Sequence, residues 1–197
     1  MQYYRHLFLL LFSLFSFFSV AQNTSIGIKG GLNLADLAYE NDLETSFKPG
    51  LLVGGFITYS TDSGFGFGGE LNYVMRGTEL VDQNITLNYL ELPLYVKYFF
   101  GQPGEKLRPK VMLGPSLGFL LSADAATNDV SENFETIDAG LMLAGGVNYS
   151  LGGGKWLNLD LRYTYGLTNI SAFENAPEVF NRNLALTVGV SFPLGNY

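Results

Sequence analysis

Few residues in this sequence could perform catalysis, and their types restrict the possible chemistry. Residues 114–118 (GPSLG) fit the G-x-S-x-G pattern of a nucleophilic serine, and residues 64–69 (GFGFGG) fit a dinucleotide-binding glycine pattern. The first pattern needs a strand-to-helix turn and a general base, and the second needs a following helix. The chain has a single histidine, His6, and no cysteine. Because Ser116 falls within a strand-like alternation, we expect no enzyme, no cofactor and no metal site.

Charged residues show a more informative spacing. They fall on one parity of the alternating segments, on the side opposite the apolar residues. If that side faces a closed interior, the charges must pair, because an unpaired buried charge is costly. We therefore predict an internal charge network. Its members are Lys29, Glu70, Arg76, Glu91, Lys97, Lys110, Asp138, Asp160 and Arg162.

The segment that best shows which structural element carries these charges is Leu87–Phe100, LNYLELPLYVKYFF. From Leu90 onward, every second residue is apolar, and the other parity carries Glu91 and Lys97. A period of two is typical of a strand, because successive side chains point to opposite faces. Its length of about ten residues or more suits a tilted strand that crosses a bilayer.

Seven further segments have the same design, and no segment has a helical period. Longer connections of residues 35–47, 77–86, 122–136 and 169–181 alternate with short ones. Even strand number, short turns and long loops indicate an eight-stranded antiparallel up-and-down transmembrane β-barrel with short periplasmic turns and long extracellular loops. The eight predicted strands are 25–34, 48–59, 65–76, 87–100, 108–121, 137–149, 156–168 and 182–192.

Two details accompany the barrel prediction. Aromatic residues beside the short turns, among them Phe65, Tyr98 and Trp156, predict a girdle at the membrane surface. Pro93 and Pro115 fall inside predicted strands, where each removes a ladder hydrogen bond. Because a closed barrel has no edge, we expect a β-bulge at each proline.

Residues 1–21 have the features of a cleaved signal peptide. Arg5 and His6 precede an apolar run from Leu7 to Val20, and small residues precede Gln22. That run is shorter than the roughly 20 residues of a spanning helix, so we favour export over a membrane anchor. We therefore divide the chain into a signal peptide, 1–21, and a single barrel domain, 22–197, and expect localisation in the cell outer membrane.

Five motifs give the chain a family resemblance. They are IGIKGGLNLADL, ELNYVMRG, LNYLELPLYVKYFF, GPSLGFLL and LDLRYTYGLTNI, and together they span the predicted barrel. The chain resembles the Bacteroidetes outer-membrane β-barrel family, whose members are described as porin-like or PorT-like. The resemblance implies an eight-stranded outer-membrane barrel and no defined activity. PorT itself is associated with secretion and gliding machinery, a role that barrel motifs alone do not transfer.

The four long loops are acidic and contain no base. Such a surface is either ordinary solvated loop or a site for a basic partner or divalent cations. No loop has the ligand spacing of a calcium motif, and the net charge of −7 disfavours nucleic acid. The twelve acids are Asp36, Glu40, Asp42, Glu44, Glu79, Asp82, Asp124, Asp129, Glu132, Glu135, Glu174 and Glu178.

These observations favour a monomeric outer-membrane protein with a structural or interaction role. Its lumen is plugged by side chains, since eight strands leave little free space inside. Its partners are outer-membrane lipid and an extracellular or cell-envelope protein that contacts the acidic loops. One alternative is a small porin, or a transport- or secretion-assisting barrel, with an ion or proton path along the lumen charges. Another is a soluble lipocalin-like barrel, which requires the apolar face of residues 90–100 to point inward.

Overall fold

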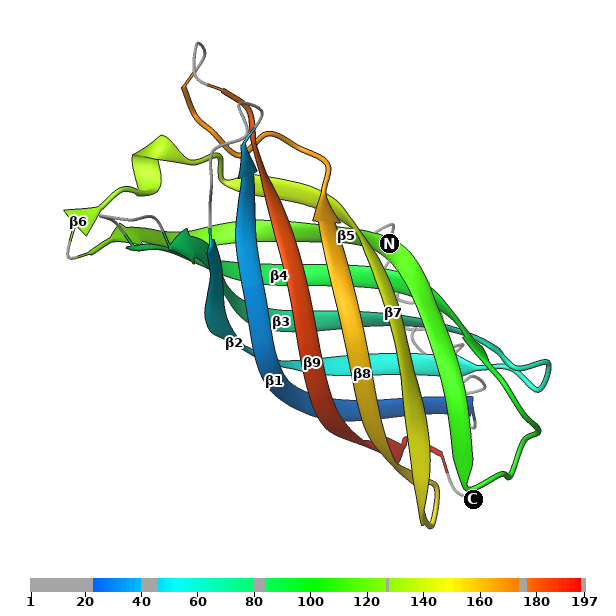
Figure 1. Ribbon diagram of the computed structural model, residues 1–197. Coiled ribbons are helices and arrows are strands. Elements are labelled where there is room, and N and C mark those ends of the chain that lie inside the picture. Colours follow the sequence, from blue (N-terminus) through cyan, green and yellow to red (C-terminus); the bar gives the residue numbers. More distant parts are fainter. Residues whose placement is uncertain (1–22, 40–45, 80–83, 127, 174–176, 196–197) are drawn as a thin grey trace, which may run out of the picture.

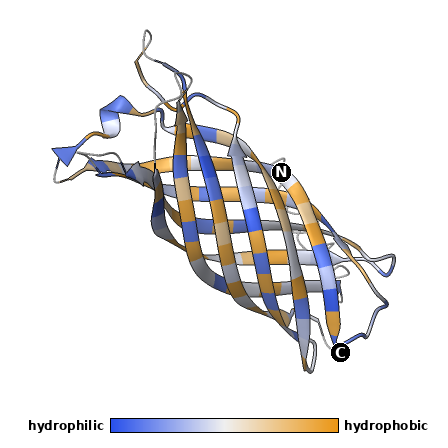
Figure 2. Ribbon diagram, viewed as in Figure 1, coloured by the Kyte–Doolittle hydropathy of each residue, from blue (hydrophilic) through white to orange (hydrophobic). Residues whose placement is uncertain are grey.

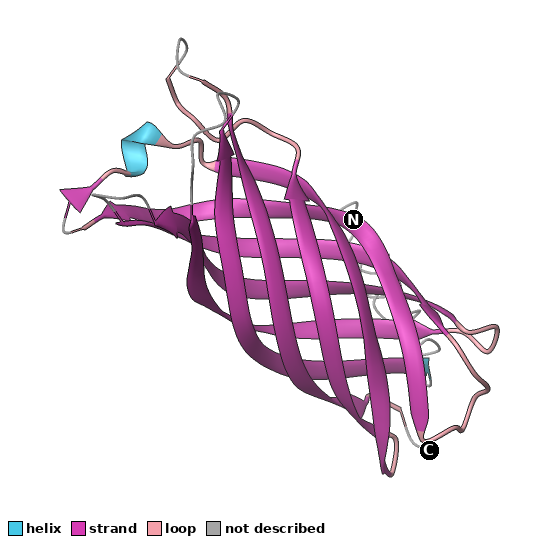
Figure 3. Cartoon of the chain, viewed as in Figure 1, coloured by secondary structure: helices cyan, strands magenta, loops and turns pink. Residues whose placement is uncertain are grey.

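We describe the protein from a computed structural model that covers residues 23–39, 46–79, 84–126, 128–173 and 177–195. The predicted signal peptide, residues 1–21, lies outside the described residues. Within these ranges no helix has the length and apolar character needed to cross a membrane. Nearly all of the described chain is β-strand (Figure 3).

The described strands close into an antiparallel barrel (Figure 1). Each long strand pairs with the next one along the chain, and β1 pairs with β9 to complete the ring. The predicted eight-stranded up-and-down barrel is thereby confirmed. A two-residue strand, β6 (Asn128–Asp129), and a short 3₁₀ helix, η2 (Ser131–Asn133), belong to the connection between β5 and β7. The eight long strands are β1 (Thr24–Tyr39), β2 (Ser46–Ser60), β3 (Phe65–Glu79), β4 (Asn84–Phe99), β5 (Leu107–Ala125), β7 (Ile137–Gly152), β8 (Lys155–Gly166) and β9 (Val179–Pro193).

The apolar parity of every long strand faces outward. Figure 2 shows the resulting alternation of hydrophobic and hydrophilic residues along the strands. On β4, Leu94 is 53% exposed, whereas its neighbour Tyr95 is buried. This orientation is opposite to the one that a lipocalin-like barrel requires, so the soluble alternative is wrong. An apolar exterior on a closed sheet suits lipid, because a closed sheet pairs its backbone N–H and C=O groups between neighbouring strands.

Aromatic side chains gather beside the short turns, as predicted for Phe65 and Tyr98. The prediction was wrong for Trp156, which has the parity of the buried Asn158 and lines a cavity inside the barrel instead. Phe65, Tyr98 and Phe100 are all exposed, and their rings form a continuous contact. The Phe65 and Tyr98 centroids lie 5.0 Å apart, and those of Tyr98 and Phe100 lie 5.1 Å apart. Rings of this kind anchor a barrel at the bilayer surface.

The prolines do not produce the predicted bulges. The β3–β4 register is the same on both sides of Pro93, and Pro115 pairs with Leu141 in an unbroken β5–β7 register. Near Pro93 the β3–β4 ladder lacks two pairs, but the pairs on either side, Gly69–Leu94 and Asn72–Glu91, have the same register, so no bulge forms. Register shifts occur instead between Asn88 and Tyr89 in the β4–β5 pair, and between Phe47 and Leu52 in the β2–β3 pair, an interval that contains Pro49.

An apolar cluster lies at the long-loop end of the barrel. It joins buried residues of the barrel wall to Ile170, which is fully buried and comes from the connection between β8 and β9. Backbone bonds tie the covering segments together, because Glu135 N–H donates to Ile170 O and Ile170 N–H donates to Val179 O. We call this cluster the cap. Its buried members are Leu37, Leu87, Tyr89, Ala123, Ile170 and Val179.

Candidate functional site

The structure places all nine charged residues of the predicted network inside the barrel. Their exposed fractions lie between 2% for Arg76 and 8% for Asp160. Alternation along each strand explains this placement, because the charged residues occupy the positions between the apolar residues that face lipid. The nine residues come from β1, β3, β4, β5, β7 and β8, so the network connects six of the eight strands of the wall.

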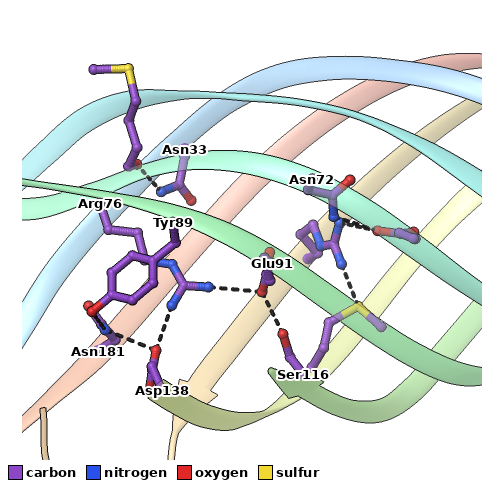
Figure 4. A network of polar contacts seen from close by, with 12 residues as sticks. Asn33, Asn72, Arg76, Tyr89, Glu91, Ser116, Asp138 and Asn181 are labelled. Atoms are coloured by element: carbon purple, nitrogen blue, oxygen red, sulfur yellow. Dashed lines mark hydrogen bonds and ion pairs between the residues drawn. The ribbon is translucent and has the colours of Figure 1, made fainter. Parts of the chain in front are cut away.

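Arg76 lies at the centre of the first group of charges, beside Tyr89 of the cap (Figure 4). Its guanidinium contacts Glu91 Oε1 at 2.9 Å and Asp138 Oδ2 at 2.6 Å. The ring of Tyr89 lies over the same guanidinium, 4.9 Å from ring centroid to Cζ. One cation therefore links β3, β4 and β7 across the interior, and both carboxylates share it.

The two carboxylates have further neutral donors (Figure 4). Ser116 Oγ donates to Glu91 Oε1 at 2.7 Å, and Asn181 Nδ2 donates to Asp138 Oδ2 at 2.9 Å. Hydrogen bonds to both carboxylates offset the cost of removing them from water. Ser116 lies within a strand and its hydroxyl donates to a carboxylate. The serine of a nucleophile elbow instead lies on a strand-to-helix turn.

A second group of charges, in the middle of the lumen, is centred on the Glu70 carboxylate. It pairs with Lys29 from β1, and Arg162 Nη1 from β8 lies 2.8 Å from its Oε2. Asn72 Nδ2 donates to the same oxygen at 2.9 Å. Here two cations share one carboxylate, the reverse of the arrangement around Arg76.

Lys110 and Asp160 form the third group, nearer the short turns. Their closest atoms, Nζ and Oδ1, are 2.9 Å apart, and Lys110 Nζ also donates to Asn158 Oδ1 at 3.2 Å. Gly146 on β7 makes room for this pair, because a Cβ there would overlap the Asp160 carboxylate. The ion pair therefore explains why residue 146, which faces the lumen, has no side chain.

Lys97 differs from the other eight charges. It is 4% exposed, yet among the described residues no carboxylate lies within 4.0 Å of its ammonium. Lys97 Nζ donates to Thr58 Oγ1 at 2.9 Å and lies 5.1 Å from the centroid of the Phe99 ring. The predicted set held five bases and four acids, and Lys97 is the base that the ion pairs leave over.

A cavity of about 370 Å³ opens at the short-turn end of the lumen, beside Lys97. Residues from all three short turns contribute to its rim, and deeper in the barrel a void of about 10 Å³ lies near Lys110 and Asp160. We call the larger cavity the vestibule. Its lining includes Thr58, Lys97, Phe99, Arg108, Asn148, Trp156, Asn158 and Ser191.

Sequence reasoning missed several members of the site. Lys48 is buried near the loop end and bonds to Asn84, but glycines blur the alternation of its segment. Tyr89 and Asn72 share the parity of the charges on their own strands, so the alternation alone could have included them. Asn181 lies outside the predicted strand 182–192, on a strand that contributes none of the nine charges, so no sequence signal marked it.

The acidic loop residues are only partly described. Glu40, Asp42, Glu44, Asp82 and Glu174 lie outside the described residues. Of the others, Asp36 is partly buried, and its Oδ1 accepts from Thr78 Oγ1 at 3.2 Å. The described segments contain no group of three or more residues of the kind that binds a metal ion. The exposed acids at this end are Glu79, Asp129, Glu132, Glu135 and Glu178.

Comparison with known proteins identifies the family. Residues 20–172, most of the chain, match the outer membrane protein beta-barrel domain. The chain belongs to this family. Its place is therefore the outer membrane, with the short turns facing the periplasm and the long loops facing outward. Among curated proteins, none matches the sequence at a significant level.

Two solved structures share the fold. Neisserial surface protein A is 16% identical, with a TM-score of 0.59, and the alignment covers 85% of this chain and 96% of that one. The outer membrane protein OprG of Pseudomonas aeruginosa is also 16% identical, with a TM-score of 0.52 and coverage of 87% and 95%. At this identity the likeness concerns the barrel alone.

Proposed function

We propose that this protein is a monomeric outer-membrane scaffold whose lumen is plugged by its own side chains and which acts through its acidic outer loops. The observation that carries the proposal is the position of Arg76 between Glu91 and Asp138, on three different strands. Salt bridges across the interior fill the space that a solute would need. Eight-stranded barrels have just enough interior to be filled in this way.

The cap supports the same conclusion. Ile170 and its apolar neighbours cover the lumen directly above the Arg76 group. A hydrated ion entering from outside would have to displace apolar side chains and then separate paired charges. The alternative of a small channel or transport-assisting barrel is favoured by one feature, the vestibule on the periplasmic side.

Single-channel conductance in a planar bilayer tests the proposal. We expect the refolded barrel to be silent, with far-UV circular dichroism confirming its strand content. Steady conductance that changes in Glu91→Gln or Arg162→Leu would instead make the lumen a path. Lys155→Leu, at the exposed start of β8, serves as the matched control because it removes a charge outside the lumen.

The outer surface can be tested separately. The triple variant Asp129→Asn, Glu132→Gln, Glu135→Gln removes three exposed charges from one loop and leaves the lumen intact. If the loops bind a basic partner, the variant should bind a lysine-rich peptide about tenfold more weakly at low salt. The difference should disappear at high salt. Equal binding by both proteins would contradict a role for this loop.

Three further points belong to the proposal. Cleavage after Ala21 is supported by the composition of residues 1–21, and N-terminal sequencing of the membrane-inserted protein tests it. The motifs in residues 87–100 and 159–170 support placement in the Bacteroidetes, PorT-like branch of the family. We also propose that the barrel has no catalytic activity, because Ser116 is bonded to Glu91 and the described residues contain no histidine.

A further inference from the structure

We propose that the vestibule binds a small oxyanion from the periplasm, with Lys97 and Arg108 as its cationic partners. The inference does not depend on the proposed scaffold role, because it concerns the opposite end of the barrel. It begins from Lys97, whose ammonium is buried and has no carboxylate partner among the described residues. A cation in this situation gains from an anion that enters from solvent.

Arg108 supplies a second cation on the same wall. Its Cζ lies 4.6 Å from the centroid of Phe99, and the Lys97 ammonium lies 5.1 Å from the same centroid. Arg108 Nε is buried without a hydrogen-bond partner, and the described part of the chain holds no carboxylate within 4.0 Å of its guanidinium. Both side chains line the vestibule.

The rest of the lining suits an oxyanion. The polar residues Thr58, Ser191, Asn148 and Asn158 line the cavity. The one acid in the lining, Asp62, is exposed at the rim. Oxyanions are bound by such sets of cations and neutral donors, and a guanidinium can hold two oxygens at once.

The size of the vestibule sets the class of ligand. A volume of about 370 Å³ falls at the lower end of the range for small-molecule sites and far exceeds the roughly 30 Å³ of one water molecule. Below it, the Lys110–Asp160 pair and the other ion pairs close the lumen. The site is therefore a blind pocket for a phosphate- or carboxylate-bearing solute, open only to the periplasm.

The chain provides its own probe. Trp156 is the only tryptophan, and it lines the vestibule. We would titrate the refolded barrel, in a neutral detergent that contains no phosphate, with inorganic phosphate while recording Trp156 fluorescence. Parallel titrations with acetate and with chloride, at matched ionic strength, separate the two oxyanion classes and simple charge screening. We expect a saturable response to phosphate, to acetate or to both, and none to chloride.

Three variants complete the test. Lys97→Met and Arg108→Gln should each weaken oxyanion binding by about tenfold or more, because each removes a charged donor. Lys106→Met, an exposed base in a periplasmic turn, should change binding by less than about twofold. Gel mobility before and after heating verifies that each variant folds. If Lys97→Met does not fold, Arg108→Gln still tests the site, because Arg108 lies nearer the mouth of the vestibule. A response that does not saturate, that chloride reproduces, or that persists unchanged in both vestibule variants would overturn the proposal.

Discussion

The two ends of the lumen treat buried charge in opposite ways. At the outer end, one cation, Arg76, is held by two carboxylates beneath an apolar cap. At the periplasmic end, the buried cation Lys97 has a hydroxyl and aromatic rings as neighbours and faces an open cavity. The first arrangement pairs the cation with two carboxylates inside the barrel, whereas the second leaves positive charge beside a cavity at one end. The contrast suggests that the outer end provides stability and the inner end provides binding.

The largest effect should follow the loss of Arg76. Arg76→Leu leaves Glu91 and Asp138 buried without a cation, and removing one partner of a buried pair typically costs about 3–5 kcal/mol. We expect a marked fall in the temperature at which the folded band converts to the unfolded band on a gel. Lys155→Leu, which removes an exposed charge, should leave that temperature unchanged. A normal transition in Arg76→Leu would contradict the pairing that we describe.

Arg162→Leu should destabilise the barrel less than Arg76→Leu. Its acceptor, Glu70, keeps the Lys29 ammonium and the Asn72 amide, so the carboxylate remains partnered. We expect a loss of about 1.5–3 kcal/mol, the range for a hydrogen bond to a charged group. Denaturant titration in detergent or lipid vesicles would measure both variants on one scale. A larger loss for Arg162→Leu would mean that wall packing, and not ion pairing, determines the order.

A smaller and more local effect is expected in the cap. Ile170→Ala removes apolar contacts from a segment that lies above the barrel wall. Local opening should become easier while the barrel itself stays folded. Hydrogen exchange should accelerate about tenfold at the Ile170 and Glu135 amides, which donate the bonds between the covering segments. Amides in the middle of β4 should exchange as before, and acceleration there would indicate that the cap supports the whole barrel.

The sequence could predict the wall of this barrel because lipid imposes a strict alternation. Every strand of residues 24–193 was located, and at the turn end each predicted bound lies within three residues of the observed one. At the loop end six of the eight strands run on by up to five residues, as in β1, which continues to Tyr39. There β7 begins at the predicted residue, and β8 ends two residues before its predicted bound. Beyond the bilayer there is no lipid to require an apolar face, so the alternation that marks a strand fades there.

The pairings inside the lumen could not be predicted in the same way. Alternation assigned each charge to the interior, but Arg162 and Glu70 are 92 positions apart in sequence, and Arg76 and Asp138 are 62 apart. Which charges meet depends on strand tilt and register, which a pattern of period two does not encode. The surplus of one base was visible in the sequence, yet its identity as Lys97 required the geometry.

The smallest effect, and one of opposite sign, is expected at Lys97. Lys97→Met keeps the length of the side chain and removes a buried charge that has no carboxylate partner in the described segments. Because apolar replacement of a buried charge removes its desolvation cost, we expect stability in anion-poor buffer to stay the same or to rise slightly. Adding phosphate should raise the heat stability of the parent barrel but not that of the variant, since a ligand stabilises only the state that binds it. If Lys97→Met instead lost as much stability as Arg76→Leu, the two ends of the lumen would not differ in the way that we infer, and Lys97 would be a structural member of the same network.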